Sequence, residues 1–199
     1  MRIVVMASTN GTDLQAIIDS IENGDLEADL SLVLSNRNCY AIERAEQAGY
    51  MTKILKVKKG ESREDYDKRC AEIIGDVDLI VLVGYMRLFS KWFVQRYKDR
   101  IINIHPSLLP SFPGMDLDVH KAVIDHGCKV SGCTIHLVDE GMDSGPMIAQ
   151  EAVVIENNET PESLKDKVQG VEKRVYPHII RKFAEGKVVI VGRKVNVLS

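Results

Sequence analysis

The sequence has few of the features that mark disulfide-rich, membrane-spanning or metal-binding proteins. Only four of its 199 residues are cysteines, and Cys39, Cys70, Cys128 and Cys133 show no CxxC spacing. This scarcity argues against a disulfide framework and a cysteine-based metal motif, so we expect reduced thiols. No apolar run approaches the roughly 18 residues of a membrane span, and the apolar start is too short for a signal peptide. We therefore expect a cytoplasmic protein without a membrane partner.

The chain also lacks an excess of charge of either sign. Its 26 lysines and arginines nearly balance 29 aspartates and glutamates, which gives a formal net charge of −3. This balance argues against a nucleic-acid partner, although a local basic pocket for one phosphate stays open. Neither GxGxxG nor GxxxxGK[ST] occurs, so the sequence supports neither a bound dinucleotide nor a P-loop nucleotide.

Short apolar runs alternate with helical patterns through the first hundred residues. The composition, 45% hydrophobic and 28% charged, is that of an ordinary globular domain. Buried strands are predicted at residues 3–6, 32–34, 54–57, 79–83 and 101–105, and helices at 14–21, 41–48, 62–74 and around 92. This alternation predicts a single α/β domain with an open, mostly parallel, Rossmann-like sheet flanked by helices.

The pattern changes in the C-terminal half. Two strand patterns, at 130–138 and 148–155, are separated by a turn-rich loop and predict an antiparallel extension of the sheet. A helix at 119–126 precedes them, and Thr160 caps another helix that Pro177 is expected to kink or break. The tail at 188–198 predicts an edge hairpin through Gly192.

The junction after the first strand, residues 7–13, is a loop of small polar residues that leads into a helix. Free N–H groups and the positive dipole end of a helix N-terminus suit a phosphate. Simple capping of the helix by Thr12 or Asp13 explains the same residues, and the sequence leaves both possibilities open.

A sharper signal is the pair Asn103 and His105. Residues two apart on a strand point to the same face, so both polar side chains leave one side of an otherwise apolar strand. Ligands bind outside the carboxyl ends of parallel strands, and Pro106 and Pro110 stiffen the chain that follows. A purely structural histidine is the alternative.

Asp143 lies in a glycine-rich loop, where a solvated turn carboxylate is the common case. Asp139 and Glu140 are close in sequence, but His120 and His126 lack the i, i+4 spacing of helical metal ligands. We therefore predict no metal site. Arg63 and Arg87 are interpreted as ordinary surface arginines unless a carboxylate of a ligand lies near them.

Two segments resemble one family. Residues 103–110, NIHPSLLP, and residues 132–146, GCTIHLVDEGMDSGP, resemble the signature of the 10-formyltetrahydrofolate-dependent formyltransferases. Length and motif order are similar to the branch that acts on glycinamide ribonucleotide in purine (IMP) biosynthesis. The resemblance implies transfer of a formyl group from 10-formyltetrahydrofolate, a co-substrate, to the primary amine of that ribotide, without a metal.

The resemblance also implies residue roles. The catalytic set would be Asn103, His105 and Asp143, with His136 and Thr134 behind it. Substrate-binding residues would be Gly11, Thr12, Asp13, Gln169 and Glu172. Folate-binding residues would be Arg63, Met86, Arg87, Leu88, Phe89, Val138, Asp139, Glu140, Gly141 and Met142. In this division residues 1–100 bind the ribotide phosphate, and residues 101–199 carry catalysis and folate binding.

This sequence departs from the family pattern in two places. It has Asp13 where the family usually has asparagine, and a carboxylate beside a phosphate is unfavourable unless it turns away. Residues 114–119 align poorly and are assigned no role. Both a monomer and a homodimer fit the sequence. The alternatives are a formyltransferase for another amine, such as a nucleotide-linked amino sugar, a 10-formyltetrahydrofolate hydrolase, and a non-catalytic folate- or nucleotide-binding module.

Overall fold

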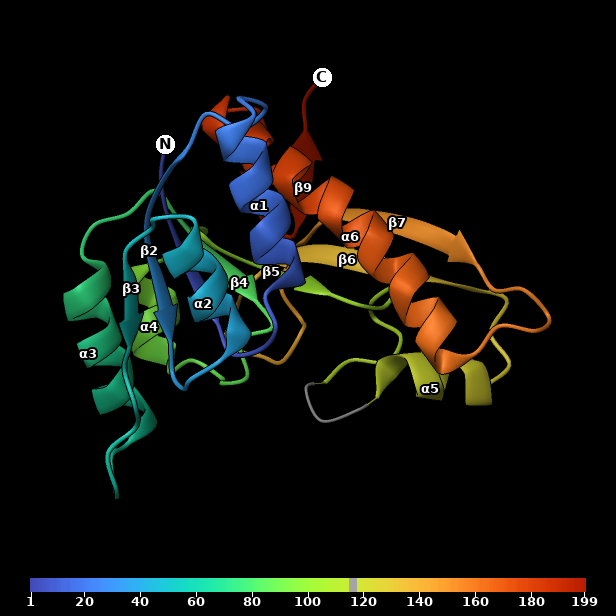
Figure 1. The fold of residues 1–199 in the computed structure, drawn as a ribbon, viewed down its shortest axis with the longest axis horizontal. Helices are drawn as coiled ribbons and strands as arrows, with labels where there is room; N and C mark the ends of the chain where they lie inside the picture. The colour runs from blue at the N-terminus through green and yellow to red at the C-terminus, as the bar shows by residue number, and fades with distance from the viewer. Residues whose placement is uncertain (115–117) are drawn as a thin grey trace.

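A computed structural model describes residues 1–114 and 118–199, so residues 115–117 of the stretch without an assigned role lie outside the described residues. A seven-stranded sheet in the order β3-β2-β1-β4-β5-β6-β7 runs through the molecule (Figure 1). The strands are β1 (Arg2–Ala7), β2 (Asp29–Ser35), β3 (Thr52–Ile54), β4 (Leu79–Val83), β5 (Ile101–His105), β6 (Val130–Leu137) and β7 (Met147–Val154). The first five are parallel, and β6 and β7 are antiparallel to their neighbours, which confirms the predicted fold class.

Helices cover both faces of the sheet. They are α1 (Thr12–Glu22), α2 (Tyr40–Gln47), α3 (Arg63–Ile74), α4 (Lys91–Arg96), α5 (Val119–Asp125) and α6 (Pro161–Ala184). The apolar sides of α1, α2, α5 and α6 pack in one core, and those of α3 and α4 pack in a second core on the opposite face. Because β1 and β4 are buried on both faces, their sequences are continuous apolar runs without alternation.

The parallel strands β1, β4 and β5 end at one edge of the sheet, which is the lower edge in Figure 1. The loops that follow these three strands therefore meet there, as expected for the ligand edge of an α/β sheet. The buried hydroxyl of Tyr176 donates to the carbonyl oxygens of Leu82 at 2.8 Å and Ile102 at 3.2 Å. These bonds fix α6 against β4 and β5 near the same edge.

Several local predictions are confirmed, and the third strand is displaced. The Thr160 hydroxyl caps α6 as predicted, and the Ser62 hydroxyl caps α3. The third strand was expected at 54–57 but occupies Thr52–Ile54, so the prediction is wrong by two residues at the start and by three at the end. The reason is its partner: β2 ends at Ser35, which pairs with Ile54.

The expected helix break at Pro177 does not occur, because α6 continues from Pro161 to Ala184. Proline removes one backbone donor, and residues on both sides of it are buried against the sheet. Tertiary packing therefore holds the helix together past the proline. Among the described residues, no helix is both long and apolar enough to cross a membrane.

The predicted tail hairpin is present as β8 (Val188–Val191) and β9 (Lys194–Val197), which form a separate two-stranded sheet. It does not join the edge of the main sheet. The Arg193 guanidinium in its turn donates to the Ser144 carbonyl at 2.8 Å. The tail thereby contacts the loop that carries Asp143.

Candidate active site

The pairing of β5 with β6 assembles the polar residues of the site. Asn103 lies opposite His136, and His105 lies opposite Thr134. The His136 ring donates from Nδ1 to the Leu137 carbonyl at 2.9 Å, so in the neutral ring Nε2 is an acceptor. Asn103 Nδ2 lies 3.2 Å from that Nε2. His136 therefore orients the Asn103 amide and leaves its second N–H available for a ligand.

Both nitrogens of the buried His105 ring face oxygen atoms. Nε2 is 2.8 Å from the Phe112 carbonyl, and Nδ1 is 3.5 Å from Asp143 Oδ2. Only a ring that is protonated on both nitrogens can donate in both directions. The arrangement therefore suits an imidazolium that holds a proton ready for transfer.

Asp143 is held in a conformation that few side chains tolerate. Its φ is 51°, in the left-handed region, where aspartate and asparagine are among the favoured non-glycine residues. Oδ2 accepts from the Gly114 N–H at 2.9 Å, and Oδ1 lies 3.6 Å from His136 Nε2. Burial alone would raise the pKa of Asp143, but His136, the Gly114 N–H and His105 together lower it. Asp143 is thus a carboxylate at neutral pH.

Thr134 is fully buried behind the site and contacts the segment that follows β5. Its hydroxyl donates to the Ser107 carbonyl at 2.7 Å and accepts from the Leu109 N–H at 2.9 Å. Gln150 adds a third bond at 3.0 Å. Thr134 therefore fixes the path of the chain after His105 and does not reach the ligand side.

A cavity of about 240 Å³ opens beside these residues, and Asn103, His105, His136 and Asp143 form part of its wall. Nine of the ten predicted folate-binding residues also line it: Met86, Arg87, Leu88, Phe89, Val138, Asp139, Glu140, Gly141 and Met142. The tenth, Arg63, is exposed at the start of α3 and is not among the lining residues. The cavity thus combines an apolar wall with a few converging polar groups, as small-molecule sites do.

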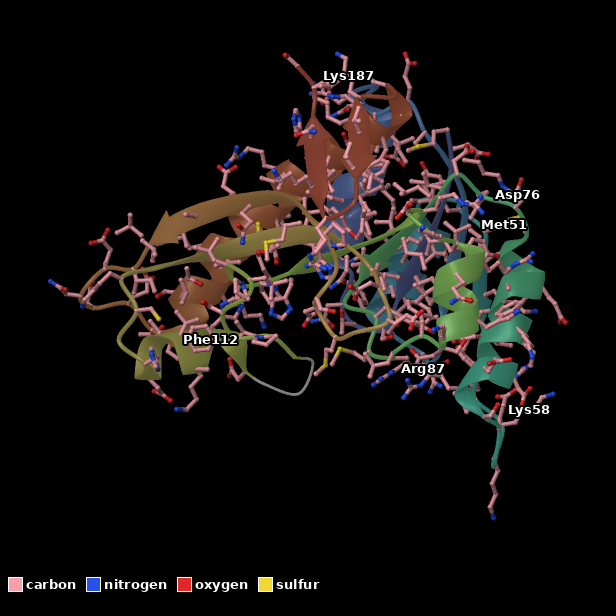
Figure 2. All side chains as sticks on the ribbon, turned by 180° about the vertical axis from the view of Figure 1, so that it is seen from behind. Met51, Lys58, Asp76, Arg87, Phe112 and Lys187 are labelled. Atoms are coloured by element: carbon pink, nitrogen blue, oxygen red, sulfur yellow. The ribbon has the colours of Figure 1, made fainter. Side chains whose placement is uncertain are left out.

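Arg87 was interpreted from the sequence as an ordinary surface arginine, but in the structure it packs on an aromatic ring. Its guanidinium lies over the Tyr66 ring, 4.4 Å from the ring centre. In Figure 2 Arg87 and Phe112 both lie in the lower half of the molecule. A planar cation that lines the cavity is placed to meet a carboxylate or a polar ring.

The loop after β1 presents an uncapped helix start. Gly11 is the residue before α1 and has φ 68°, and within the described part of the chain the helix start has no side-chain cap bond. A Cβ on Gly11 would lie 2.7 Å from Ala41 Cβ, so the tight approach of α2 requires glycine here. Capping by Thr12 or Asp13 is therefore wrong. The first N–H groups of α1 thus receive no side-chain cap from Gly11, as a phosphate site requires.

Two carboxyl groups are buried between α1 and α6. Asp13 is 7% exposed and Glu172 is 5% exposed. Burial raises the pKa of both groups, their mutual repulsion raises that of Glu172 further, and Lys173 opposes the shift in each. Gln169 lies half-buried one turn earlier on α6. Asp13 therefore turns inward, away from the solvent side of the loop.

The Asp13→Asn substitution should make stability less dependent on pH. Because folding raises the pKa of Asp13, the protonated form is stabilised, and this contribution is lost as the pH rises above the ordinary carboxyl range. We expect the asparagine variant to be more stable than wild type by about 2 kcal/mol at pH 8 and unchanged at pH 4. Denaturant unfolding at the two pH values checks this. An equal difference at both would show that the carboxyl group does not titrate on folding.

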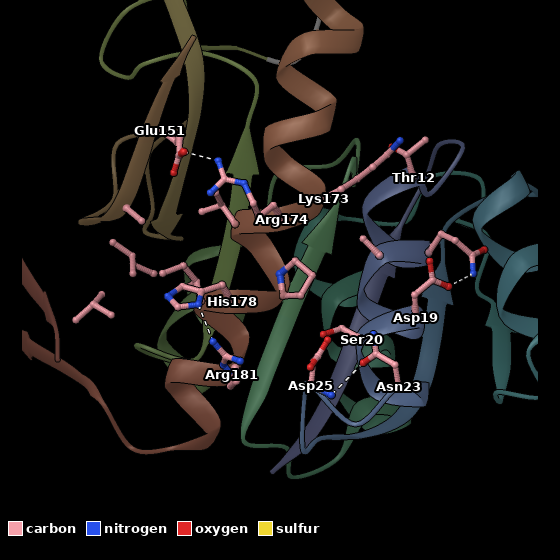
Figure 3. A pocket seen from close by; sticks show the side chains of 18 of the residues that line it. Thr12, Asp19, Ser20, Asn23, Asp25, Glu151, Lys173, Arg174, His178 and Arg181 are labelled. Carbon is pink, nitrogen blue, oxygen red and sulfur yellow. Dashed lines mark hydrogen bonds and ion pairs between the residues drawn. The ribbon is translucent and has the colours of Figure 1, made fainter. Parts of the chain in front are cut away.

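A second, larger cavity of about 980 Å³ forms a groove between α1, α6 and β7 (Figure 3). Thr12 is the one predicted substrate-binding residue that lines it, and it lies at the end formed by the start of α1. The groove walls carry several charged side chains, among them Asp19, Lys173 and Arg174. This groove continues from the uncapped helix start along the length of α1.

Among the described residues, no three histidine, cysteine, aspartate or glutamate side chains gather as a metal site would need. The prediction of a metal-free site stays a prediction. Sequence patterns missed the groups that hold the catalytic candidates in place, namely the Phe112 carbonyl and the Gly114 N–H. Both are backbone atoms, which no residue pattern marks.

Fold and site together define an α/β protein with an amide, an imidazole and a carboxylate around a pocket at the carboxyl edge of its sheet. The chain belongs to the formyl transferase family, whose model matches residues 1–180. It is 38% identical to the phosphoribosylglycinamide formyltransferase of Escherichia coli, over 94% of this chain and 89% of that protein. It superposes on a glycinamide ribonucleotide transformylase of Symbiobacterium toebii with a TM-score of 0.95 and 42% identity, covering 100% and 94% of the two chains.

Some relatives are much longer. The trifunctional purine biosynthetic protein adenosine-3 of Gallus gallus is 37% identical over 96% of this chain, but the match spans 19% of that protein. The chain thus corresponds to about a fifth of the vertebrate trifunctional relatives and to about nine-tenths of the bacterial phosphoribosylglycinamide formyltransferases.

Proposed function

We propose that the chain transfers the formyl group of 10-formyltetrahydrofolate to the primary amine of glycinamide ribonucleotide. The products are formylglycinamide ribonucleotide and tetrahydrofolate. In this reaction the amine nitrogen bonds to the formyl carbon, and the bond from that carbon to the folate nitrogen breaks. The proton released by the amine ends on the folate nitrogen. The bacterial relatives named for this reaction, matched over most of their length, support the proposal.

The observation that carries the proposal is the convergence of three groups on one cavity wall. The Asn103 amide and the His105 ring come from β5 and the Asp143 carboxylate comes from a loop, yet all three border the same pocket. Attack of an amine on a formyl group creates an oxyanion and requires proton movement. A binding module needs neither an amide donor nor a charged histidine at one point.

In this mechanism Asn103 donates its free N–H to the developing oxyanion. His105, paired with Asp143, provides a proton from Nε2 when an oxygen of the substrate replaces the Phe112 carbonyl. Asp143 keeps the ring oriented and favours its charged form. His136 acts through Asn103 as a positioning residue, and Thr134 supports the chain after His105.

The cavity suits a folate as co-substrate. Met86, Leu88 and Phe89 offer apolar surface to a pterin ring, and the loop 138–142 offers backbone groups to its edges. The family makes formyl-folate the donor, and folate supplies the carbonyl carbon, while the chain supplies placement and electrostatics. Arg87 is placed to meet the polar end of the donor, and Arg63 stays a prediction.

The ribotide would extend from the catalytic residues to the start of α1. Gly11 and Thr12 would contact its phosphate, and Gln169 and Glu172 would contact its ribose. The division into residues 1–100 for the phosphate and 101–199 for catalysis and folate stays a prediction, as do a cytoplasmic location and a monomeric or homodimeric state.

The test is an absorbance assay of formyl transfer from 10-formyltetrahydrofolate, run with and without glycinamide ribonucleotide. Turnover that depends on the ribotide is expected. The Asn103→Ala variant, which lacks the oxyanion donor, is the control for contaminating activity and should be at least about a hundredfold slower. Turnover without an acceptor would identify a hydrolase. Folate binding without turnover would point to another amine or to a binding module.

A further inference from the structure

Two buried carboxyl groups lie beside the proposed phosphate site. Asp13 and Glu172 are both more than nine-tenths buried, and Asp13 Oδ1 has no hydrogen-bond partner among the described residues. Asp13 is also in the first turn of α1, next to the N–H groups that would bind a phosphate. A carboxylate there repels a phosphate dianion. Binding of the ribotide therefore requires a compensating positive charge.

Lys173 is the cation that acts on both carboxyl groups. It follows Glu172 on α6, and its charge lowers the pKa of Asp13 and of Glu172. Its own side chain is exposed and lines the groove together with Thr12. Figure 3 shows Lys173 extended toward Thr12, at the end of the groove where α1 begins. Its ammonium group is thus directed to the uncapped helix start.

The other lysine and arginine side chains of this groove are already engaged by the protein. Arg174 pairs with Glu151. Arg44 Nε donates to the Asn10 carbonyl at 2.8 Å, and Arg181 Nη2 lies 3.0 Å from His178 Nδ1. Within residues 1–114 and 118–199, Lys173 forms no salt bridge and no side-chain hydrogen bond. Its charge is therefore available to a ligand.

We propose that Lys173 binds the phosphate group of the acceptor, together with the first N–H groups of α1. This inference rests on the proposed function, because it takes the acceptor to be a phosphorylated ribose derivative. The helix dipole and one ammonium group both favour a phosphate at this point. Lys173 also offsets the carboxylate of Asp13, so the chain retains phosphate binding despite that residue. It is a binding residue that determines specificity for the phosphorylated acceptor.

The experiment removes the lysine charge and the ligand phosphate separately. Dissociation constants of glycinamide ribonucleotide and of its dephosphorylated riboside are measured by calorimetry for wild type and Lys173→Gln. The variant should bind the ribotide about tenfold to a hundredfold more weakly, as for a lost charge-assisted bond, and the riboside unchanged. Arg174→Gln is the matched control, since it removes the neighbouring charge on α6, and it should leave both constants unchanged.

Two results would overturn the proposal. Equal losses for ribotide and riboside, or no loss for either, would show that Lys173 does not contact the phosphate. A loss that disappears in an Asp13→Asn background would show that Lys173 acts only by balancing Asp13. In the expected case the loss persists in that background.

Ribose 5-phosphate separates this proposal from the proposed function. If wild type binds ribose 5-phosphate more tightly than Lys173→Gln does, but shows no transfer to glycinamide ribonucleotide, Lys173 is a phosphate-binding residue and the acceptor assignment is wrong. If wild type binds neither ribose 5-phosphate nor the ribotide, the phosphate site itself is refuted.

Discussion

His105→Ala is expected to lower the turnover number by about 10³- to 10⁴-fold, the range contributed by a general acid–base group. An imidazole ring can both donate and accept a proton near neutral pH. Its two nitrogens lie against the Phe112 carbonyl and Asp143, so alanine removes the proton donor and disconnects the carboxylate. The Michaelis constants of both substrates should change far less than the turnover number.

Stability must be measured with this variant, because His105 is buried. Its removal leaves the Phe112 carbonyl with only the long contact to the Ser107 hydroxyl at 3.5 Å, and the loss of the closer donor costs about 1–3 kcal/mol. His105→Gln is the companion variant, since glutamine can still donate to that carbonyl but cannot carry a proton. A stable glutamine variant with the same loss of turnover would assign the effect to chemistry. A near-normal rate in either variant would remove His105 from the mechanism. His178→Ala, an exposed histidine on α6, should retain wild-type turnover.

The fold could be predicted from the sequence because the strands of its parallel part are buried on both faces. Such strands are continuous apolar runs, as at Val81 and its neighbours, and the helices between them have amphipathic spacing. The errors arose where tertiary contacts determine where a helix or strand begins and ends. The length of β3 is set by its pairing with β2, and α6 continues through Pro177 because its inner face is anchored to the sheet.

The candidate site was less accessible to sequence patterns. That Asn103 and His105 share a strand face follows from the two-residue period. Their closeness to His136 follows from the register of β5 with β6, which no single strand contains. The position of Asp143 depends on a backbone φ of 51° and on the Gly114 N–H, 29 residues away in sequence. Neither the register between distant strands nor a backbone donor is marked by a particular residue type. The sequence could therefore name the candidate catalytic residues but not their arrangement.

The surroundings of Asp13 also could not be predicted from the sequence, because they depend on residues far away in the chain. The sequence shows a carboxylate where a phosphate is expected, and charge alone predicts repulsion. The structure adds that the side chain is buried beside Glu172 and that Lys173 offsets both. A departure from a family motif can therefore be compensated by a residue 160 positions away in the sequence. The compensation depends on the packing of α1 against α6.

Asp143→Asn is expected to reduce the turnover number about 10²- to 10³-fold, with a much smaller change in folate affinity. Asparagine tolerates the left-handed backbone of this position, and its side-chain oxygen can still accept from the Gly114 N–H. The variant therefore removes the charge beside His105 with little change in the loop. Alanine neither favours the left-handed backbone nor accepts from the Gly114 N–H. The Asp143→Ala variant would therefore combine a strained backbone with the loss of charge, and the two effects could not be separated.

The pH dependence of this variant separates a role in catalysis from a role in folding. Because its neighbours lower the pKa of Asp143, the wild-type carboxylate stays ionised throughout the neutral range, and its protonation does not limit the rate there. Because the Asp143 charge favours the protonated His105 ring in wild type only, the ratio of wild-type to variant turnover should rise from pH 6 to pH 8. A ratio that is the same at both pH values would show that the Asp143 charge does not act on the His105 proton. Equal losses in turnover and in folate affinity would make Asp143 a binding residue, and His105 would then need another partner to hold its charge.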